Sequence, residues 1–186
     1  MKNFKIMQTK NVNISNEVWD SGINIVEPVI VIHPAISTIL KVCQKHAGNN
    51  EFSILFKGLW TNECFYVSDT YYIPKQKVST TSVDYEEDIG AVRREQGYNV
   101  VVHSHPFAHS SQFSSADNEH INSHFDCSLL YTPSGIADNV LLIPINENLK
   151  VRIKASDILT EIINIEVNGL ENIKENITPE ANFNAM

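Results

Sequence analysis

The stretch VVVHSHPFAHSSQFSSAD, residues 100–117, contains the strand and the polar side chains around which the rest of the chain is arranged. Its three consecutive valines predict a strand buried on both faces. Side chains alternate along a strand, so His103 and His105 point to one face and Ser104 points to the other. Pro106 cannot donate a ladder hydrogen bond and ends the strand. The sequence therefore predicts two neighbouring imidazoles at the end of a buried strand.

A third candidate ligand follows in the same stretch. Residues 107–113 are expected to form a polar loop, and Ser114 begins a predicted short helix that carries Asp117. Two histidines and one carboxylate, with a fourth position left to water, make the recurring composition of a catalytic zinc site. Structural zinc sites usually have four protein ligands and are commonly rich in cysteine, and the cysteines of this chain lie elsewhere. The pattern predicts one Zn²⁺ per chain, bound by His103, His105 and Asp117.

The spacing His-x-His-Pro, seven residues, Ser, two residues, Asp resembles the signature of the JAMM/MPN zinc metalloprotease family and matches it without a gap. The resemblance implies that an upstream glutamate, just ahead of an apolar strand ending in glycine, completes the site. Glu51 in the segment EFSILFKG, residues 51–58, fits this description. Many family members have a glycine two or three residues after this glutamate, where this chain has Ser53 and Ile54.

The resemblance also implies a role for each residue. Zinc held by His103, His105 and Asp117 would lower the pKa of its remaining water from about 15.7 towards about 7. Glu51 would act as the general base that takes the proton of this water and returns it to the departing amine. Ser114 would donate a hydrogen bond to the oxyanion, a contact typically worth about 2.7 to 4 kcal/mol.

Simpler interpretations exist for some of these residues. Ser114 and Asp117 could be an N-cap and a first-turn acid that stabilise the start of a helix. His120 and His124 lie four apart on a predicted helix, as the ligands of zincin metalloproteases do. The zincin pattern needs Glu directly after the first histidine, and Ile121 stands there. We therefore expect His120 and His124 to be ordinary helix residues.

Composition restricts the class of protein. The chain of 186 residues, 42% hydrophobic and 19% charged, fits one globular domain. A net charge of −8 without a Lys or Arg cluster argues against a nucleic-acid-binding surface. The sequence has no apolar run long enough for a signal peptide or for the roughly 20 residues of a membrane span, so we expect a soluble cytoplasmic protein. Its three cysteines are expected to be buried thiols in a reducing compartment: Cys43, Cys64 and Cys127.

Helices and strands that do not strictly alternate predict an α+β domain. Helices are predicted over residues 34–47, 84–96 and 116–124, and strands over residues 29–32, 51–56, 65–73, 100–105, 127–131, 140–145 and 149–154, with turns at 58–62 and 132–135. Residues 158–167 fit either a helix or a strand, and residues 178–186 are expected to be a loose tail. The family resemblance implies a curved, mixed, mostly antiparallel sheet flanked by helices, the cytidine-deaminase-like MPN fold. It covers residues 32–154, with residues 1–31 as an N-terminal extension and residues 155–186 as a C-terminal extension and tail.

The resemblance leaves two classes of function. The first is a zinc metallopeptidase that hydrolyses an amide or isopeptide bond at the extended C-terminal tail of a ubiquitin-like or sulfur-carrier protein. A peptidase that acts on cell-wall peptides, as phage tail-associated members do, is an alternative. The second class is a non-catalytic MPN scaffold, which the complete motif disfavours. His109 is a candidate for the border of the substrate groove, and residues 75–85 are expected to form a mobile loop over it. A protein or peptide substrate is the expected partner, while nucleic acid and membrane are not expected and the oligomeric state stays open.

Overall fold

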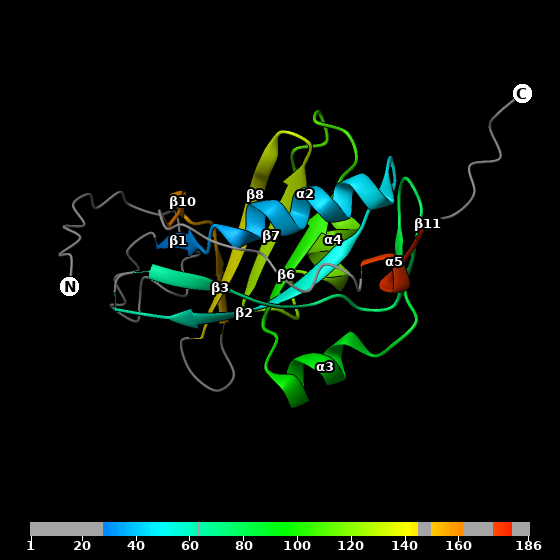
Figure 1. The fold of residues 1–186 in the computed structure, drawn as a ribbon. Helices are drawn as coiled ribbons and strands as arrows, with labels where there is room; N and C mark the ends of the chain where they lie inside the picture. The colour runs from blue at the N-terminus through cyan, green and yellow to red at the C-terminus, as the bar shows by residue number, and fades with distance from the viewer. Residues whose placement is uncertain (1–27, 63, 145–149, 162–172, 180–186) are drawn as a thin grey trace, which may run out of the picture.

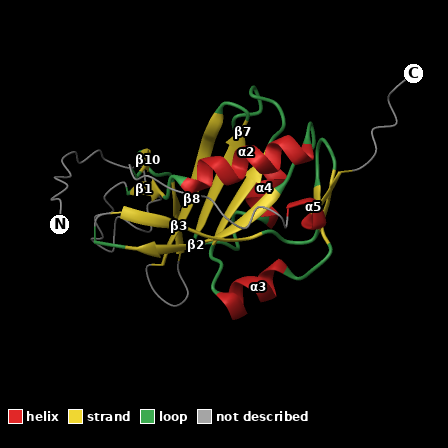
Figure 2. Cartoon of the chain, viewed as in Figure 1, coloured by secondary structure: helices red, strands yellow, loops and turns green. Residues whose placement is uncertain are grey.

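The described part of the chain contains two β-sheets and four helices in the computed structural model (Figures 1 and 2). This part comprises residues 28–62, 64–144, 150–161 and 173–179. The larger sheet has eight strands, in the spatial order β10 (Asp157–Thr160), β1 (Val29–Ile32), β3 (Cys64–Tyr72), β2 (Ser53–Trp60), β6 (Val100–Ser104), β7 (Cys127–Thr132), β8 (Gly135–Pro144) and β9 (Lys150–Ile153). The smaller sheet has the order β11 (Ile177–Pro179), β4 (Gln76–Val78) and β5 (Val83–Tyr85).

The larger sheet is mixed. Within the described residues, four of its pairings are antiparallel (β2–β3, β2–β6, β7–β8 and β8–β9) and three are parallel (β10–β1, β1–β3 and β6–β7). The helices are α2 (Ala35–Ala47), α3 (Ile89–Gln96), α4 (Ser115–His120) and α5 (Ile173–Asn176). The predicted α+β class with a mixed sheet is confirmed. No helix of the described ranges is long and apolar enough to cross a bilayer.

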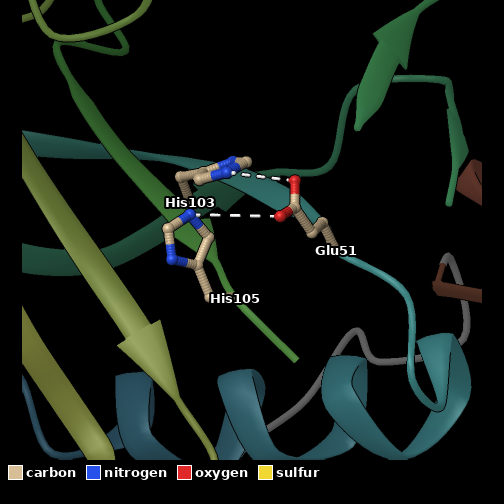
Figure 3. Close-up of side chains that lie close together, drawn as sticks. All are labelled: Glu51, His103 and His105. Atoms are coloured by element: carbon tan, nitrogen blue, oxygen red, sulfur yellow. Dashed lines mark ion pairs between the residues drawn. The ribbon is translucent and has the colours of Figure 1, made fainter. Parts of the chain in front are cut away.

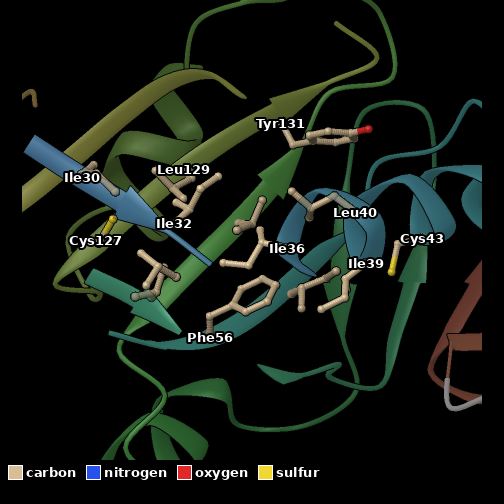
Figure 4. Packing of buried hydrophobic residues seen from close by; sticks show 14 of the residues in the cluster. Ile30, Ile32, Ile36, Ile39, Leu40, Cys43, Phe56, Cys127, Leu129 and Tyr131 are labelled. Carbon is tan, nitrogen blue, oxygen red and sulfur yellow. The ribbon is translucent and has the colours of Figure 1, made fainter. Parts of the chain in front are cut away.

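Helix α2 packs on one face of the larger sheet. Its buried side chains include four that belong to the same core cluster as Phe56 of β2, and Figure 4 labels them: Ile36, Ile39, Leu40 and Cys43. Pro34 is the N-cap residue, and Gly48 follows the helix with a φ of 65°, a backbone conformation that favours glycine. The helix predicted over residues 34–47 is confirmed.

Strand β6 is buried on both faces, as the run of valines predicts. Val100 and Val102 belong to the cluster that packs against α2, and Val101 belongs to a second cluster with Val92 of α3. Because side chains alternate along a strand, His103 points to the same face as Val101. The histidine side of the sheet is therefore the face opposite α2.

The helix predicted over residues 84–96 is wrong at its start. Residues 83–85 form β5, and helix α3 begins only after Asp88, whose side chain accepts a hydrogen bond from the Ala91 N–H. The Glu87 carboxylate, which precedes Asp88, accepts a hydrogen bond from the Tyr72 hydroxyl at 2.7 Å. Asp84 could also cap a helix, but it belongs to β5 and pairs with Lys77 of β4. Asp88 is therefore the residue that caps helix α3.

The turn predicted over residues 58–62 is also wrong in part, because β2 continues through Gly58 to Trp60. The Asn99 side chain pairs with the Gly58 backbone, accepting from its N–H at 2.8 Å and donating to its carbonyl at 3.1 Å. A Cβ atom at Gly58 would lie 2.6 Å from the Phe65 ring. Glycine is present here because another side chain approaches the backbone closely.

The C-terminal predictions have mixed outcomes. The antiparallel pairing of β8 and β9 is confirmed. β8 begins at Gly135, five residues before the start of the predicted strand at residue 140. Ile158 lies in a strand, β10, which runs parallel to β1. Thr178 and Pro179, expected in the tail, belong to β11, which pairs with β4. The predictions for residues 1–27, 146–148, 162–167 and 180–186 lie outside the described residues.

Candidate metal centre

Strand β6 places the two histidines at the centre of the larger sheet, between β2 and β7. His103 lies in the strand, and His105 directly follows it, donating its backbone N–H to the Tyr131 carbonyl at 2.9 Å. The two imidazole rings are nearly perpendicular, with centroids 5.3 Å apart. Ser104 points to the other face, where its hydroxyl accepts the Phe52 N–H at 2.8 Å. The predicted alternation of these side chains is confirmed.

Glu51 approaches the imidazoles from the residues just before β2. The antiparallel register pairs Ser53 with His103, which brings the start of β2 beside the end of β6. Figure 3 shows the Glu51 carboxylate turned towards both rings. Its Oε2 atom lies 3.3 Å from His103 Nε2, and its Oε1 atom lies 3.9 Å from His105 Nε2.

Asp117 approaches the same two rings from helix α4. Its Oδ1 atom lies 3.4 Å from His103 Nε2, and its Oδ2 atom lies 3.4 Å from His105 Nε2. Asp117 also forms a capping box with Ser114, the N-cap residue of α4. The helix-start interpretation of Ser114 and Asp117 is therefore confirmed, and it is compatible with a place in the site.

The separations between these atoms fit ligands of one metal ion better than hydrogen bonds. Charge-assisted N–H···O bonds measure about 2.7–2.9 Å. Two ligand atoms about 2.0–2.1 Å from one ion at a tetrahedral angle lie about 3.3 Å apart. The candidate ligand atoms of Glu51, His103 and His105 all lie within 4.8 Å of one another. This cluster could hold a metal ion, and Asp117 contacts both of its imidazoles.

Burial and mutual contacts set the charge state of the site. Glu51, His103, His105 and Asp117 are each at most 9% exposed. The contact with the Asp117 carboxylate raises the pKa of His105, while burial opposes this shift. Burial alone would raise the pKa of Asp117, but the contact with His105, the charge of His103 and the hydrogen bonds with Ser114 hold it well below its usual range. Asp117 is therefore ionised, as a carboxylate ligand must be.

The ring nitrogens on the far side of both imidazoles have partners of their own. His105 Nδ1 lies 2.9 Å from the Ser110 carbonyl oxygen, and His103 Nδ1 lies 3.2 Å from Ser53 Oγ. A carbonyl only accepts, so in neutral His105 the proton is on Nδ1 and the Nε2 lone pair faces the carboxylates. Metal-binding histidines are held in this way. Sequence reasoning did not find these roles of Ser53 and Ser110, because both contacts depend on strand register and loop path.

The four residues line a cavity of about 840 Å³. The turn of the β4–β5 hairpin, residues 80–82, and the loop of residues 105–112 line it as well. Phe107 is 44% exposed at this cavity, and its ring stacks on His109 with centroids 5.6 Å apart. His109 and the segment 75–85 thus border the cavity, as expected, but the segment is a paired hairpin and not an irregular loop.

No protein-family model matches the chain. A search of curated proteins also finds no match.

The second histidine pair does not form a competing helical site. Helix α4 ends at His120, and residues 121–124 form turns, so the helix predicted over residues 116–124 is wrong at its end. His124 is exposed. The two histidines therefore do not share one face of a helix, as zincin ligands would.

Proposed function

We propose that the chain is a zinc metallopeptidase of the JAMM/MPN type, which hydrolyses an amide or isopeptide bond. The observation that supports it is the convergence of Glu51, His103, His105 and Asp117 from three separate segments at one cavity. These are the residues that the motif and its upstream glutamate designate. The cytidine-deaminase-like MPN fold belongs to the same proposal, and the position of α2 directly before the Glu51 segment and β2 agrees with it.

The donor set fits zinc. Two imidazole nitrogens and a carboxylate oxygen are ligands that zinc accepts in catalytic sites, and the partners of both Nδ1 atoms leave the Nε2 atoms to coordinate. His103, His105 and Asp117 would hold the ion. When bound, zinc supplies Lewis acidity and lowers the pKa of a coordinated water.

Different constraints on the two carboxylates support different roles for them. Asp117 is fixed by the Ser114 N–H, which donates to its Oδ2 atom at 2.8 Å. In the described part of the chain, the Glu51 carboxylate contacts the two imidazoles and has no such backbone donor. A ligand benefits from fixation, whereas a proton carrier must turn between the attacking water and the leaving group. Glu51 takes the proton of the water and returns it to the departing amine.

Ser114 is the proposed donor to the oxyanion. Its Oγ atom accepts the Asp117 N–H at 3.1 Å, which leaves the hydroxyl proton to be donated elsewhere. Ser114 lines the cavity together with Glu51 and Asp117. A donor preorganised in this way acts on the charge that develops in the transition state.

The cavity suits an extended polypeptide. β5 is an edge strand of the smaller sheet within the described residues, and its Val83 and Tyr85 line the cavity. A flexible C-terminal tail could add to this edge as a further strand and present its last peptide bond to the centre. The substrate of the proposal is the tail of a ubiquitin-like or sulfur-carrier protein, and cell-wall peptides are the alternative.

The test combines metal analysis with cleavage assays. Zinc content is measured for the wild type and for His103→Ala/His105→Ala, and both are incubated with a panel of ubiquitin-like fusion proteins and cell-wall peptides. We expect one zinc per wild-type chain, and cleavage that a chelator and the double substitution both abolish. A folded wild type that takes up no zinc would rule out the enzyme and leave the non-catalytic scaffold.

A further inference from the structure

Ser53 lies behind the centre and has no part in the proposed chemistry. It is fully buried and stands opposite His103 in the β2–β6 pairing. Its Oγ atom lies 3.2 Å from His103 Nδ1, on the side of the ring away from the carboxylates. Ser53 therefore contacts the His103 ring nitrogen that does not face the carboxylates.

The β4–β5 hairpin holds the backbone of Ser53. Gln76 of β4 is 1% exposed, and its side-chain amide accepts the Ser53 N–H at 2.9 Å and donates to the Ser53 carbonyl at 2.8 Å. The register of β2 with β3 begins only at Leu55. One buried amide thus replaces the strand partner that β3 does not provide at Ser53.

Tyr85 reaches the same place from the next strand. It pairs with Gln76 in the hairpin, so both side chains point to one face. The Tyr85 hydroxyl is buried without a hydrogen bond of standard geometry to any described residue. Burial raises the pKa of Tyr85 to about 12, while the nearby Ser53 hydroxyl lowers it and the charge of Asp117 raises it. Tyr85 is therefore a neutral phenol beside Ser53 with unused hydrogen-bonding capacity.

The hydrogen-bond donors and acceptors of His103, Ser53 and Tyr85 can be matched in sequence. A histidine that coordinates through Nε2 carries its proton on Nδ1, and in His103 this proton would be donated to Ser53 Oγ. The Ser53 hydroxyl proton then needs an acceptor of its own, because buried polar groups are almost always hydrogen-bonded. The oxygen of Tyr85 is the buried, unpartnered atom that can accept it.

We propose that Ser53 and Tyr85 form an outer hydrogen-bond chain that fixes the tautomer and orientation of His103 and thereby strengthens metal binding. The inference rests on the proposed function in one respect, namely that the centre binds zinc. Tyr85 is a positioning residue, since it acts through Ser53 and His103. The β4–β5 hairpin then supports a metal ligand in addition to lining the cavity.

The test measures the zinc dissociation constant of the full-length apoprotein by competition with a chromophoric chelator, for the wild type, Ser53→Ala, Tyr85→Phe and the double variant. We expect zinc affinity to fall about 10- to 100-fold in Ser53→Ala, as for other outer partners of metal ligands. Loss of one hydrogen bond in Tyr85→Phe should weaken zinc binding about two- to tenfold. The double variant should resemble Ser53→Ala, because both changes break one chain. The ring ¹⁵N shifts of His103 in the zinc-loaded proteins report its tautomer and ring environment, which we expect both substitutions to change.

The matched control is Tyr66→Phe, which removes a hydroxyl that donates to Glu161 at the exposed surface. It should bind zinc as the wild type does. Both test substitutions remove a single oxygen atom, and thermal unfolding checks that each variant is folded. The proposed hydrogen-bond chain would be overturned if folded Tyr85→Phe bound zinc with wild-type affinity, or if the losses of zinc affinity simply added in the double variant. Neither result would contradict the proposed metallopeptidase function. A wild type that binds no zinc would overturn the proposed function and this inference with it.

Discussion

Ser114 and Asp117 are joined by two reciprocal hydrogen bonds. The Asp117 N–H donates to Ser114 Oγ at 3.1 Å, and the Ser114 N–H donates to Asp117 Oδ2 at 2.8 Å. The same Oδ2 atom lies 3.4 Å from His105 Nε2. The capping box that begins helix α4 therefore also fixes a carboxylate against the imidazoles, so local helix stability and ligand placement depend on the same two bonds.

Substitution of Ser114 by glycine separates its capping role from its proposed catalytic role. Glycine at an N-cap costs only a few tenths of a kcal/mol relative to serine, whereas alanine costs about 1 kcal/mol. We expect Ser114→Gly to lower kcat by about 10²- to 10³-fold, since an oxyanion donor is lost, with little change in urea unfolding. Ser114→Thr keeps the hydroxyl and is the control. Wild-type kcat in Ser114→Gly would leave Ser114 as a cap alone.

Zinc content distinguishes the roles of the two carboxylates. Glu51→Gln should retain one zinc per chain and lose nearly all turnover, because the base is removed and the ligands stay. Asp117→Asn should lose zinc, since the residue fixed by the capping box is the proposed ligand. Elemental analysis of the two folded variants checks this. Loss of zinc in Glu51→Gln together with retention in Asp117→Asn would exchange the two roles.

Metal binding should also stabilise the fold. An ion that binds only the native state adds about 2.7 kcal/mol to the unfolding free energy when its free concentration is about 100 times its dissociation constant. We expect a chelator to lower the thermal unfolding temperature of the wild type, and zinc to restore it. His103→Ala/His105→Ala should unfold at the same temperature with and without chelator. An equal response of both proteins would place zinc binding outside this centre.

The sequence predicts the parts of the site that local geometry determines. His103 and His105 share a face because strand alternation requires it, and Ser114 and Asp117 meet because a capping box spans three residues. Glu51 could be named only through the family resemblance, since its approach depends on how β2 pairs with β6. Local rules thus predict which side chains can meet within one segment, while pairing between segments determines the rest.

The residues that sequence reasoning missed are those held by non-local contacts. Gln76 and Tyr85 reach Ser53 only because the hairpin folds over the start of β2, and residues 75–85 have the polar composition of a loop. The prediction of where helix α3 begins was wrong for a related reason. Two acidic residues four apart could each cap that helix, and the sheet pairing of residues 83–85 decides which one does.

Substitution of Gly58 tests the close approach of neighbouring side chains to its backbone, which the sequence alone did not reveal. A Cβ atom there would lie 2.6 Å from the Phe65 ring and 2.7 Å from Val100 Cγ2, so either the strands or the side chains must move. We expect Gly58→Ala to lower the unfolding free energy by about 1–3 kcal/mol, as overpacking does, measured by urea denaturation. In Gly90→Ala the new methyl group would lie 3.0 Å from the capping atom Asp88 Oδ1 and 3.2 Å from Arg94 Nη1, which are side-chain ends and not backbone or ring atoms. Because alanine is favoured over glycine in a helix by about 1 kcal/mol, we expect Gly90→Ala to cost less than Gly58→Ala. Equal losses in both variants would argue against a specific clash at Gly58.

The three cysteines should differ sharply in reactivity. Cys43 and Cys127 are fully buried, as predicted, whereas Cys64 is partly exposed, so its predicted burial is wrong. Burial raises the pKa of Cys43 to about 12, and burial together with the charge of Asp126 raises that of Cys127 well above its usual range. Since the thiolate is the reactive form, an aromatic disulfide reagent at about pH 8 should modify one thiol in the native protein and all three in denaturant. Raising the pH to about 10 should not add a second native thiol, because both buried groups remain protonated there. Two or more native equivalents at pH 8 would mean that the core around α2 or β7 opens on the timescale of the reaction.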